Sequence, residues 1–316
     1  MAAPKDDNSR VKSYSRSQVA VSTMDGTILK GYRYDLQLPV GGRRARVPAS
    51  KAPLLCIPSE LGNTEEYEQF IAALANQTGA PRRVYNFDLR GRGGSQMGKD
   101  KDTTTETDAD DIISICDAMG LHHCDVLVTG RAALAVFLVA PKRPSTIGRL
   151  ILNDAGPEFD SVGIAKLSTT MKRAPEPADW SDAVDVLKKI KGQTFSSFND
   201  QDWQDMAKTI WKDENGRPVK NYDKELHRLS NAEDYDSKQP LVWQEFKLFK
   251  NTPTLFIRGA KSELMTEALS DKILKLQGRA KLAIATGQGH APALHKDNLP
   301  QSIADFLVTT GQDTVN

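Results

Sequence analysis

An apolar strand that turns directly into an apolar helix lies in the middle of the sequence. The strand pattern covers Cys124 to Thr129, the helix pattern begins at Ala132, and Gly130 stands at the turn between them. A strand followed at once by a helix is the repeating unit of sheets whose strands run parallel. This stretch therefore favours an α/β fold and places a glycine at its sharpest turn.

The rest of the chain alternates strand and helix patterns in the same way. Residues 52–58 form a continuous apolar run of the kind that is covered on both faces, and residues 64–77 carry apolar side chains at helical spacing. An Asp-Gly turn at residues 25–26, between two alternating segments, predicts an antiparallel hairpin at the start. Further strands are expected at 83–88, 147–154, 251–259 and 280–286, and further helices at 108–119, 265–277 and 298–308. The order predicts a mostly parallel, doubly wound sheet with right-handed crossovers.

The pattern changes between residues 161 and 238. This segment consists of charged helical stretches that carry tryptophans, and it has no buried-strand pattern. Residues 1–17 are polar and aperiodic, which is typical of a disordered leader. We therefore expect one core made of residues 18–160 and 239–316, with residues 161–238 as a helical insertion.

Composition excludes several classes of partner. The chain has 42 basic and 41 acidic residues, so no global field favours nucleic acid or an anionic membrane surface. No apolar run approaches the roughly 20 residues that span a bilayer, and the first residues lack the apolar core of a secretory signal. The three cysteines lie in apolar contexts, which indicates buried, reduced thiols. We expect a soluble, cytoplasmic protein without a nucleic-acid or membrane partner; import into an organelle stays open.

The sequence predicts neither a metal nor another cofactor. His122, His123 and Cys124 are adjacent. Neighbouring residues on a strand point to opposite faces, so these side chains would not converge on one ion.

Five separated stretches, in order, resemble the α/β-hydrolase superfamily, and within it the ester- and lactone-hydrolase-like branch with a helical cap. They are residues 54–58, 86–95, 150–158, 253–264 and 287–292. The resemblance covers the chain from about residue 18 to 310. It implies an α/β-hydrolase fold in which residues 161–238 form a cap over the active face.

The resemblance implies positions for the catalytic base and acid. His290, in a glycine-flanked loop after the last strand, matches the base. Glu263 stands where the family usually has an aspartate and would orient the imidazole. Asp154 and Glu158, at the end of the strand before the insertion, are substitute partners.

The nucleophile position holds no nucleophile. The family turn reads G-x-S-x-G, and the three marked positions are Val128, Gly130 and Ala132 here. Glycine adopts the positive φ of this turn at little steric cost, but it has no oxygen or sulfur with which to form an acyl-enzyme. Thr129 is one residue away and should point elsewhere.

The oxyanion region, implied by the resemblance at Ser59, Glu60 and Arg131, departs as well. A carboxylate at Glu60 would repel a developing oxyanion unless it turned outward. An equally good interpretation is that Ser59 and Glu60 belong to the turn that precedes the helix beginning near Thr64.

Three hypotheses for function follow. The first is a pseudoenzyme that acts by binding a small molecule in the inherited pocket or a protein partner. The second is an enzyme, a hydrolase or lyase, in which a His290–Glu263 dyad activates water or substrate. The third is a structural subunit of a larger assembly. The sequence leaves the ligand and the oligomeric state open.

Overall fold

The computed structural model describes residues 14–37, 39–40, 43–44, 51–77, 82–101, 103–173, 175–226 and 242–308. The expected leader therefore lies outside the described residues up to position 13. Residues 14–17, which we included in it, belong instead to the first strand. The end of the expected insertion, from residue 227, is also outside them.

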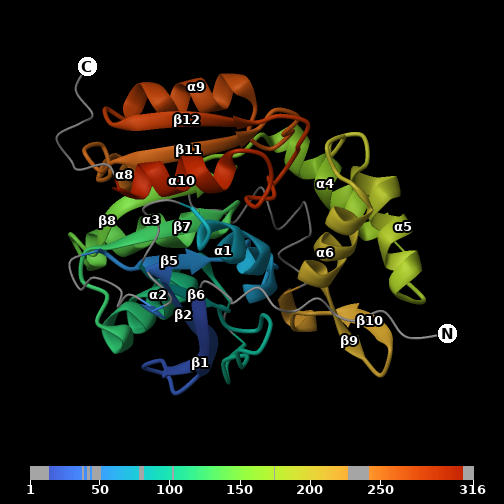
Figure 1. Cartoon of the computed structure of the whole chain (residues 1–316), viewed down its shortest axis with the longest axis horizontal. Coiled ribbons are helices and arrows are strands. Elements are labelled where there is room, and N and C mark those ends of the chain that lie inside the picture. Colours follow the sequence, from blue (N-terminus) through green and yellow to red (C-terminus); the bar gives the residue numbers. More distant parts are fainter. Residues whose placement is uncertain are drawn as a thin grey trace.

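One sheet of eight strands forms the centre of the molecule (Figure 1). Its order is β1-β2-β6-β5-β7-β8-β11-β12, and the five strands from β5 onward, together with β6, run parallel. β1 and β2 form the predicted antiparallel hairpin around the Asp-Gly turn. The strands are β1 (Tyr14–Ser22), β2 (Ile28–Leu36), β5 (Leu54–Ile57), β6 (Arg83–Phe87), β7 (Cys124–Thr129), β8 (Ile147–Asn153), β11 (Thr254–Gly259) and β12 (Ala280–Ala285), with β3 (Pro39–Val40) and β4 (Arg43–Arg44) as a separate short pair.

Helices cover both faces of the sheet, which confirms the doubly wound α/β prediction. One apolar core joins the sheet to α2 (Thr105–Met119), α3 (Ala132–Lys142), α8 (Trp243–Lys247) and α9 (Glu267–Leu276). The core on the other face joins it to α1 (Glu68–Leu74), which follows the 3-10 turn η1 (Thr64–Tyr67), and to α10 (Leu299–Val308). Every residue of β5 and β7 is buried, as their uninterrupted apolar sequences require.

Two helix ends differ from the sequence interpretation. Helix α2 begins at Thr105, three residues before the expected start at 108, and the side chain of Thr104 caps it by accepting a hydrogen bond from the backbone N–H of Thr107. Helix α3, for which the sequence pattern indicated only the start at Ala132, continues through Pro141 to Lys142. Its apolar face explains this, because Phe137 packs edge-on against Phe246 of α8 and holds the last turns against the core.

The segment between β8 and β11 forms a separate lobe beside the sheet (Figure 1). It contains α4 (Ser161–Arg173), α5 (Trp180–Lys191) and α6 (Asp200–Ile210), and α5 and α6 share a small core around Trp203. A hairpin of β9 (Trp211–Glu214) and β10 (Arg217–Lys220) follows. The helices agree with the helical pattern predicted for residues 161–238. The hairpin was not predicted, although its turn, Asn215-Gly216, is a sequence strongly preferred in two-residue hairpin turns.

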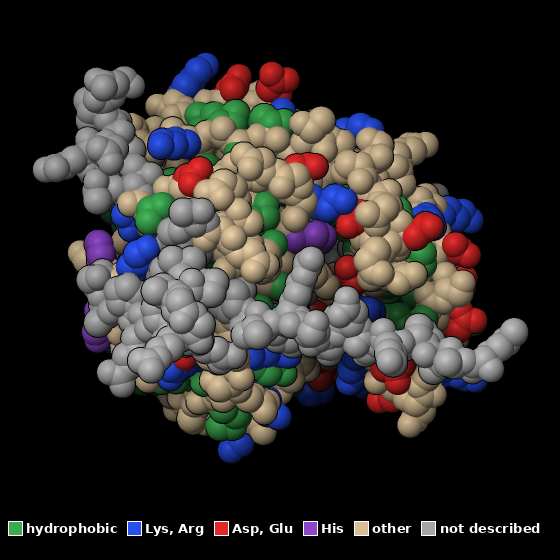
Figure 2. All heavy atoms as spheres, viewed as in Figure 1, with side chains coloured by type: hydrophobic (Ala, Val, Ile, Leu, Met, Phe, Trp, Pro, Cys, Tyr) green, Lys and Arg blue, Asp and Glu red, His purple; other side chains and the backbone are tan. Residues whose placement is uncertain are grey.

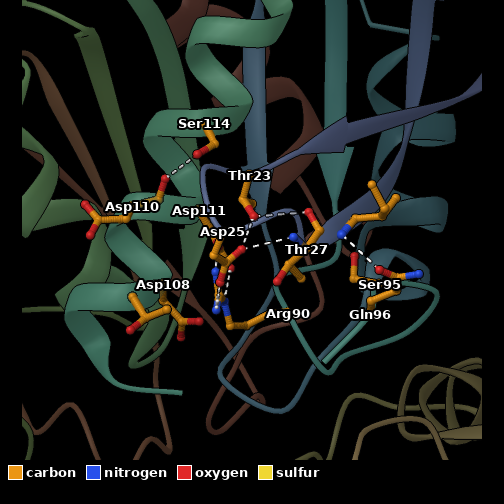
Figure 3. Close-up of polar contacts among 12 residues, drawn as sticks. Thr23, Asp25, Thr27, Arg90, Ser95, Gln96, Asp108, Asp110, Asp111 and Ser114 are labelled. Carbon is orange, nitrogen blue, oxygen red and sulfur yellow. Dashed lines mark hydrogen bonds and ion pairs between the residues drawn. The ribbon is translucent and has the colours of Figure 1, made fainter. Parts of the chain in front are cut away.

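Arginine–carboxylate pairs built on buried arginines connect the loops near the sheet. Figure 3 shows Asp25, from the β1–β2 turn, and Asp111, from α2, both pointing toward Arg90. Arg92 makes a two-bond contact with Asp108 of α2. These pairs fix the turn at residues 90–94 against α2.

Within the described residues, no helix is long and apolar enough to cross a membrane. Basic and acidic side chains are interspersed over the face shown in Figure 2, in keeping with the balanced charge of the sequence. The three cysteines are buried free thiols.

Candidate functional site

Gly130 ends β7 and faces His290. Its φ is +57°, the left-handed conformation that glycine adopts without strain. A Cβ built on Gly130 would lie 3.2 Å from Cε1 and 3.3 Å from Nε2 of the His290 ring. The strand-to-helix turn is thus formed, and the imidazole reaches the position at which a side chain of residue 130 would stand.

Asp154 is the acidic partner of His290. Its Oδ2 lies 2.8 Å from Nδ1 of His290, and the Asp154 side chain is completely buried. Ser262 donates to the same oxygen at 2.5 Å, and the Gly259 N–H donates to Oδ1 at 2.9 Å. Both oxygens of Asp154 therefore have donors, which fixes the carboxylate and through it the ring.

The expectation that Glu263 orients His290 is corrected by this geometry. The Glu263 carboxylate is exposed and pairs with Lys166 of α4. Glu158, the other substitute partner, pairs with Lys272 and accepts a hydrogen bond from the Trp243 indole. Of the two substitutes, Asp154 is the one that contacts His290. It directly follows β8, whereas Glu263 stands four residues beyond the end of β11.

The lobe between β8 and β11 is fastened to the histidine loop. Lys191, the last residue of α5, donates to the backbone oxygen of His290 at 3.1 Å, and the Ser197 N–H donates to Gly287 O at 3.3 Å. A Cβ on Gly289 would come within 2.9 Å of the Thr194 hydroxyl, so the two segments are in close contact there. Burial lowers the pKa of Lys191, an effect that the charge of Asp154 partly offsets.

Ser59, the first residue of the predicted oxyanion region, is committed to Glu66. Its N–H and its hydroxyl both donate to Oε2 of Glu66, at 3.0 and 2.8 Å. Burial raises the pKa of Glu66, although the two Ser59 donors, the Thr129 hydroxyl and the His290 charge act in the opposite direction. Ser59 therefore belongs to the turn before the helix, which is one of the two alternatives from the sequence.

Glu60 and Arg131, the other two residues of that region, form an ion pair. Nη1 of Arg131 lies 2.6 Å from Oε2 of Glu60, and the Arg131 side chain is buried. The Arg92 guanidinium holds the Glu60 backbone oxygen at 2.8 Å. Burial raises the pKa of Glu60, and Arg131 and Arg92 counteract that rise. The carboxylate is thus compensated by Arg131.

A network of hydroxyl and amide groups surrounds Thr129, the residue that precedes Gly130. Thr129 contacts the Tyr67 hydroxyl at 2.7 Å and accepts from the Asn153 amide at 3.1 Å. Tyr67 in turn donates to the backbone oxygen of Ile57. The Thr129 hydroxyl is thus engaged by Tyr67 and Asn153. Cys56 is completely buried in the core, and burial raises the pKa of its thiol.

No group of three or more metal-ligating side chains occurs in the part of the chain that the structure describes. His123 is exposed and contacts the backbone oxygen of Ser145, while Cys124 is buried in β7. A polar depression of about 250 Å³ lies between β2, η1 and the loop after β6. Its lining includes Asp88, Tyr32 and Asn221 but neither His290 nor Gly130.

Sequence reasoning missed Glu66 as a residue of this site and ranked Asp154 second. Glu66 lies near the start of residues 64–77, which the sequence predicts to be helical, and an acidic residue there is explained by the helix dipole alone. The 3-10 geometry of η1 instead directs it back to Ser59. For Asp154, the available signal was its position at the carboxyl end of a strand, where ligands of open α/β sheets bind.

Comparison with known proteins agrees with this architecture. The family model described as alpha/beta hydrolase fold matches residues 52–297, more than three quarters of the chain. The chain belongs to the α/β-hydrolase family. A curated relative, the 3-hydroxybutyrate-oligomer hydrolase of Cupriavidus necator, is 22% identical over 256 residues, which are 78% of this chain and 84% of the relative.

Solved structures support the fold. An α/β hydrolase from Novosphingobium aromaticivorans superimposes with a TM-score of 0.80 at 23% identity, covering 94% of this chain and 99% of that chain. A putative hydrolase from Rickettsia typhi gives a TM-score of 0.71 at 20% identity, covering 93% and 98%. The E-2-(acetamidomethylene)succinate hydrolase structure gives 0.70 at 14%, covering 93% and 100%. At these identities the likeness concerns the fold alone.

Proposed function

We propose that this chain is a pseudoenzyme of the α/β-hydrolase family, which binds a small molecule or a protein partner without forming an acyl-enzyme. The observation that carries the proposal is Gly130 facing the His290 ring at the strand-to-helix turn. Acyl transfer through this position requires a nucleophilic side-chain atom, and glycine has none.

Two features of the surroundings support the proposal. Among the described contacts, neither the Ser59 hydroxyl nor the Cys56 thiol hydrogen-bonds to His290, so neither replaces the missing nucleophile. Both Ser59 donors are also directed to Glu66 and are not available to an oxyanion.

The lobe formed by α4, α5 and α6 would serve as the cap, since Lys191 and Ser197 hydrogen-bond it to the loop that carries His290.

Turnover of short p-nitrophenyl esters tests this proposal. The purified protein should show no hydrolysis above that of the His290→Ala variant. Hydrolysis that depends on His290 would contradict the pseudoenzyme proposal and favour the second candidate below.

A reconstruction tests whether the nucleophile is the decisive loss. We expect Gly130→Ser, combined with Val128→Gly and Ala132→Gly, to gain a pre-steady-state burst that His290→Ala abolishes, because the His290–Asp154 pair is in place. Without a burst, the oxyanion region must be deficient as well. The triple variant carrying Gly130→Ala instead is the matched control.

A second candidate is an enzyme in which the His290–Asp154 dyad activates water or removes a substrate proton. It is favoured by the 2.8 Å contact and by the two further donors that fix Asp154. An oriented imidazole is a competent general base if a substrate reaches it. Such an enzyme would turn over without a covalent intermediate and without a burst.

A further inference from the structure

The polar depression of about 250 Å³ lies where the core of the molecule meets the lobe. Its walls come from the β1–β2 hairpin, η1 and the turn after β6, and Asn221, which follows β10, bounds it on the side of the lobe. The Gly93 N–H donates to the Asn221 backbone oxygen at 2.9 Å, so core and lobe are in contact there. Small-molecule sites occur preferentially at interfaces between structural units.

The lining of the depression has a buried part and an exposed part. Asn63, Thr64 and Asp88 are buried, at most 4% exposed, whereas Lys30 and Glu65 are exposed. We call the three buried residues the floor and the two exposed residues the rim. The floor consists of polar side chains that water reaches only through the depression itself.

The lining does not suit an apolar ligand. Among the described residues that form it, none is aliphatic, and Tyr32 is the single aromatic residue. The Arg16 guanidinium already lies over the Tyr32 ring, 3.6 Å from its centroid. An acyl chain or a flat aromatic molecule would displace water from polar groups without replacing its hydrogen bonds.

Asp88 provides hydrogen-bond acceptors in the floor. Its Oδ1 accepts the Thr64 N–H at 2.6 Å, and its Oδ2 accepts the Gly94 N–H at 2.8 Å. An ionised carboxylate has about four lone-pair sites, so each oxygen can accept one further hydrogen bond. A ligand that donates from two adjacent groups therefore matches this carboxylate.

The turn beside Asp88 is held in place independently of any ligand. Arg92 makes two hydrogen bonds to Asp108 of α2, at 2.8 and 3.0 Å. A Cβ on Gly93 would collide with the Asp88 carboxylate, so the backbone of the turn lies directly against it. A site that is already formed loses less entropy when a ligand binds.

The charges of the lining select the chemical class of the ligand. Lys30 and Glu65 have opposite signs, so the rim favours neither an anion nor a cation. A hydroxyl group donates to a carboxylate and also accepts from an ammonium or an amide. We infer that this depression binds a small neutral molecule with adjacent hydroxyl groups, such as a monosaccharide, through Asp88 and the turn at residues 93–94. The site is separate from His290, so this inference goes beyond the proposed function and does not depend on it.

Ring-shaped probes of similar size test the inference. The methyl glycosides of glucose, mannose and galactose are compared with cyclohexanol and cyclohexylamine at pH 8, above the pKa of about 6 to which burial raises Asp88. Binding is followed by saturation-transfer NMR and by shifts of the backbone amides of Gly93 and Gly94. We expect at least one glycoside to bind about tenfold more tightly than either cyclohexyl compound, the scale of one or two net hydrogen bonds.

Two glycine variants locate the contact. A Cβ on Gly94 would lie 3.4 Å from Cδ of Lys30 and 3.8 Å from Oδ2 of Asp88, so Gly94→Leu fits at its base and places its side chain among the lining residues. It should abolish glycoside binding. Gly278→Leu, between α9 and β12, is the matched control, since its Cβ would meet only the Lys250 backbone oxygen at 3.7 Å, and it should bind as wild type does.

Asp88→Asn tests the carboxylate itself. It replaces one acceptor oxygen by a donor, and we expect glycoside binding to weaken about tenfold. Gly94→Leu remains decisive if Asp88→Asn does not fold.

Four results would overturn the inference. They are no binding of any glycoside, tighter binding of cyclohexanol or cyclohexylamine, unchanged binding in Gly94→Leu, and shifts confined to the His290 ring. Failure of the proposed function is a different result, because it appears as ester turnover that depends on His290.

Discussion

The ring of His290 faces Gly130 so closely that a Cβ on Gly130 would lie 3.3 Å from Nε2. Nδ1 on the other side of the ring is held by Asp154 at 2.8 Å. A histidine–aspartate pair therefore lies beside a residue that has no side chain.

Stability of glycine variants should report this contact. Gly130→Ala introduces both the strain of a positive φ and a tight contact with His290, whereas Gly120→Ala, at φ +64° with nothing within 4 Å of its Cβ, introduces strain alone. We expect a loss of about 1 kcal/mol in unfolding free energy for Gly120→Ala and about 2 kcal/mol for Gly130→Ala. Urea denaturation measures both. Equal losses would show that His290 does not lie against residue 130.

The assignment of the acid can be tested by comparing two carboxylates. Asp154→Asn disrupts a fully buried group that holds His290 and Ser262, so we expect it to lower the unfolding free energy by about 3 kcal/mol. Glu263→Gln breaks an exposed pair with Lys166 and should change it by less than about 1 kcal/mol. Denaturant titration of both variants decides. The reverse order would restore Glu263 as the partner of His290.

Asp88 should make stability depend on pH. Burial raises its pKa from 3.8 to about 6, despite the N–H donors of Thr64 and Gly94. Between pH 4 and pH 6 the folded chain then holds a proton that the unfolded chain has lost, so the contribution of Asp88 to stability falls as pH rises through this range. The fall amounts to about 3 kcal/mol.

Asp88→Asn removes this titration. The stability difference between wild type and Asp88→Asn should therefore shrink by up to about 3 kcal/mol from pH 4 to pH 7. Denaturation at a series of pH values measures it. A difference that grows with pH would mean that the N–H donors outweigh burial and that the pKa is lowered.

The Arg90–Asp111 pair should be strongly coupled. Asp111 is completely buried and accepts two hydrogen bonds from Arg90, at 2.6 and 2.8 Å. Arg90→Met leaves this charge without a partner, and we expect a loss of about 3 to 5 kcal/mol. The double variant with Asp111→Leu should lose clearly less than the sum of the single variants, as a double-mutant cycle would reveal. Additive losses would show that the two residues act independently.

Much of the fold could be predicted because its signals are local. Uninterrupted apolar runs gave β5 and β7, and the Asp-Gly turn gave the β1–β2 hairpin. The Asn215-Gly216 hairpin carried an equally local signal, which was overlooked inside a charged, helical segment. The extent of α3 depended on packing of Phe137 against α8, a contact between distant parts of the chain.

The sequence predicted which loops form the candidate site, but it did not predict which side chains contact each other there. The positions of His290 and Gly130 follow from motifs that are contiguous in sequence. The choice between Asp154 and Glu263 depends on two neighbouring parallel strands, β8 and β11, whose carboxyl ends lie at the same edge of the sheet. Either acid could reach a histidine from there, and only the side-chain contacts separate them. Glu66 depended on the backbone path of a 3-10 turn, which no sequence pattern specified.

The central claim is that this chain forms no acyl-enzyme, and the mass of the intact protein tests it most directly. Wild-type protein is mixed with p-nitrophenyl butyrate, quenched in acid during the first turnover, and weighed by mass spectrometry. We predict an unchanged mass and no burst of p-nitrophenol, because the position facing His290 has no nucleophilic atom. A stoichiometric butyryl adduct that disappears in His290→Ala would contradict the account.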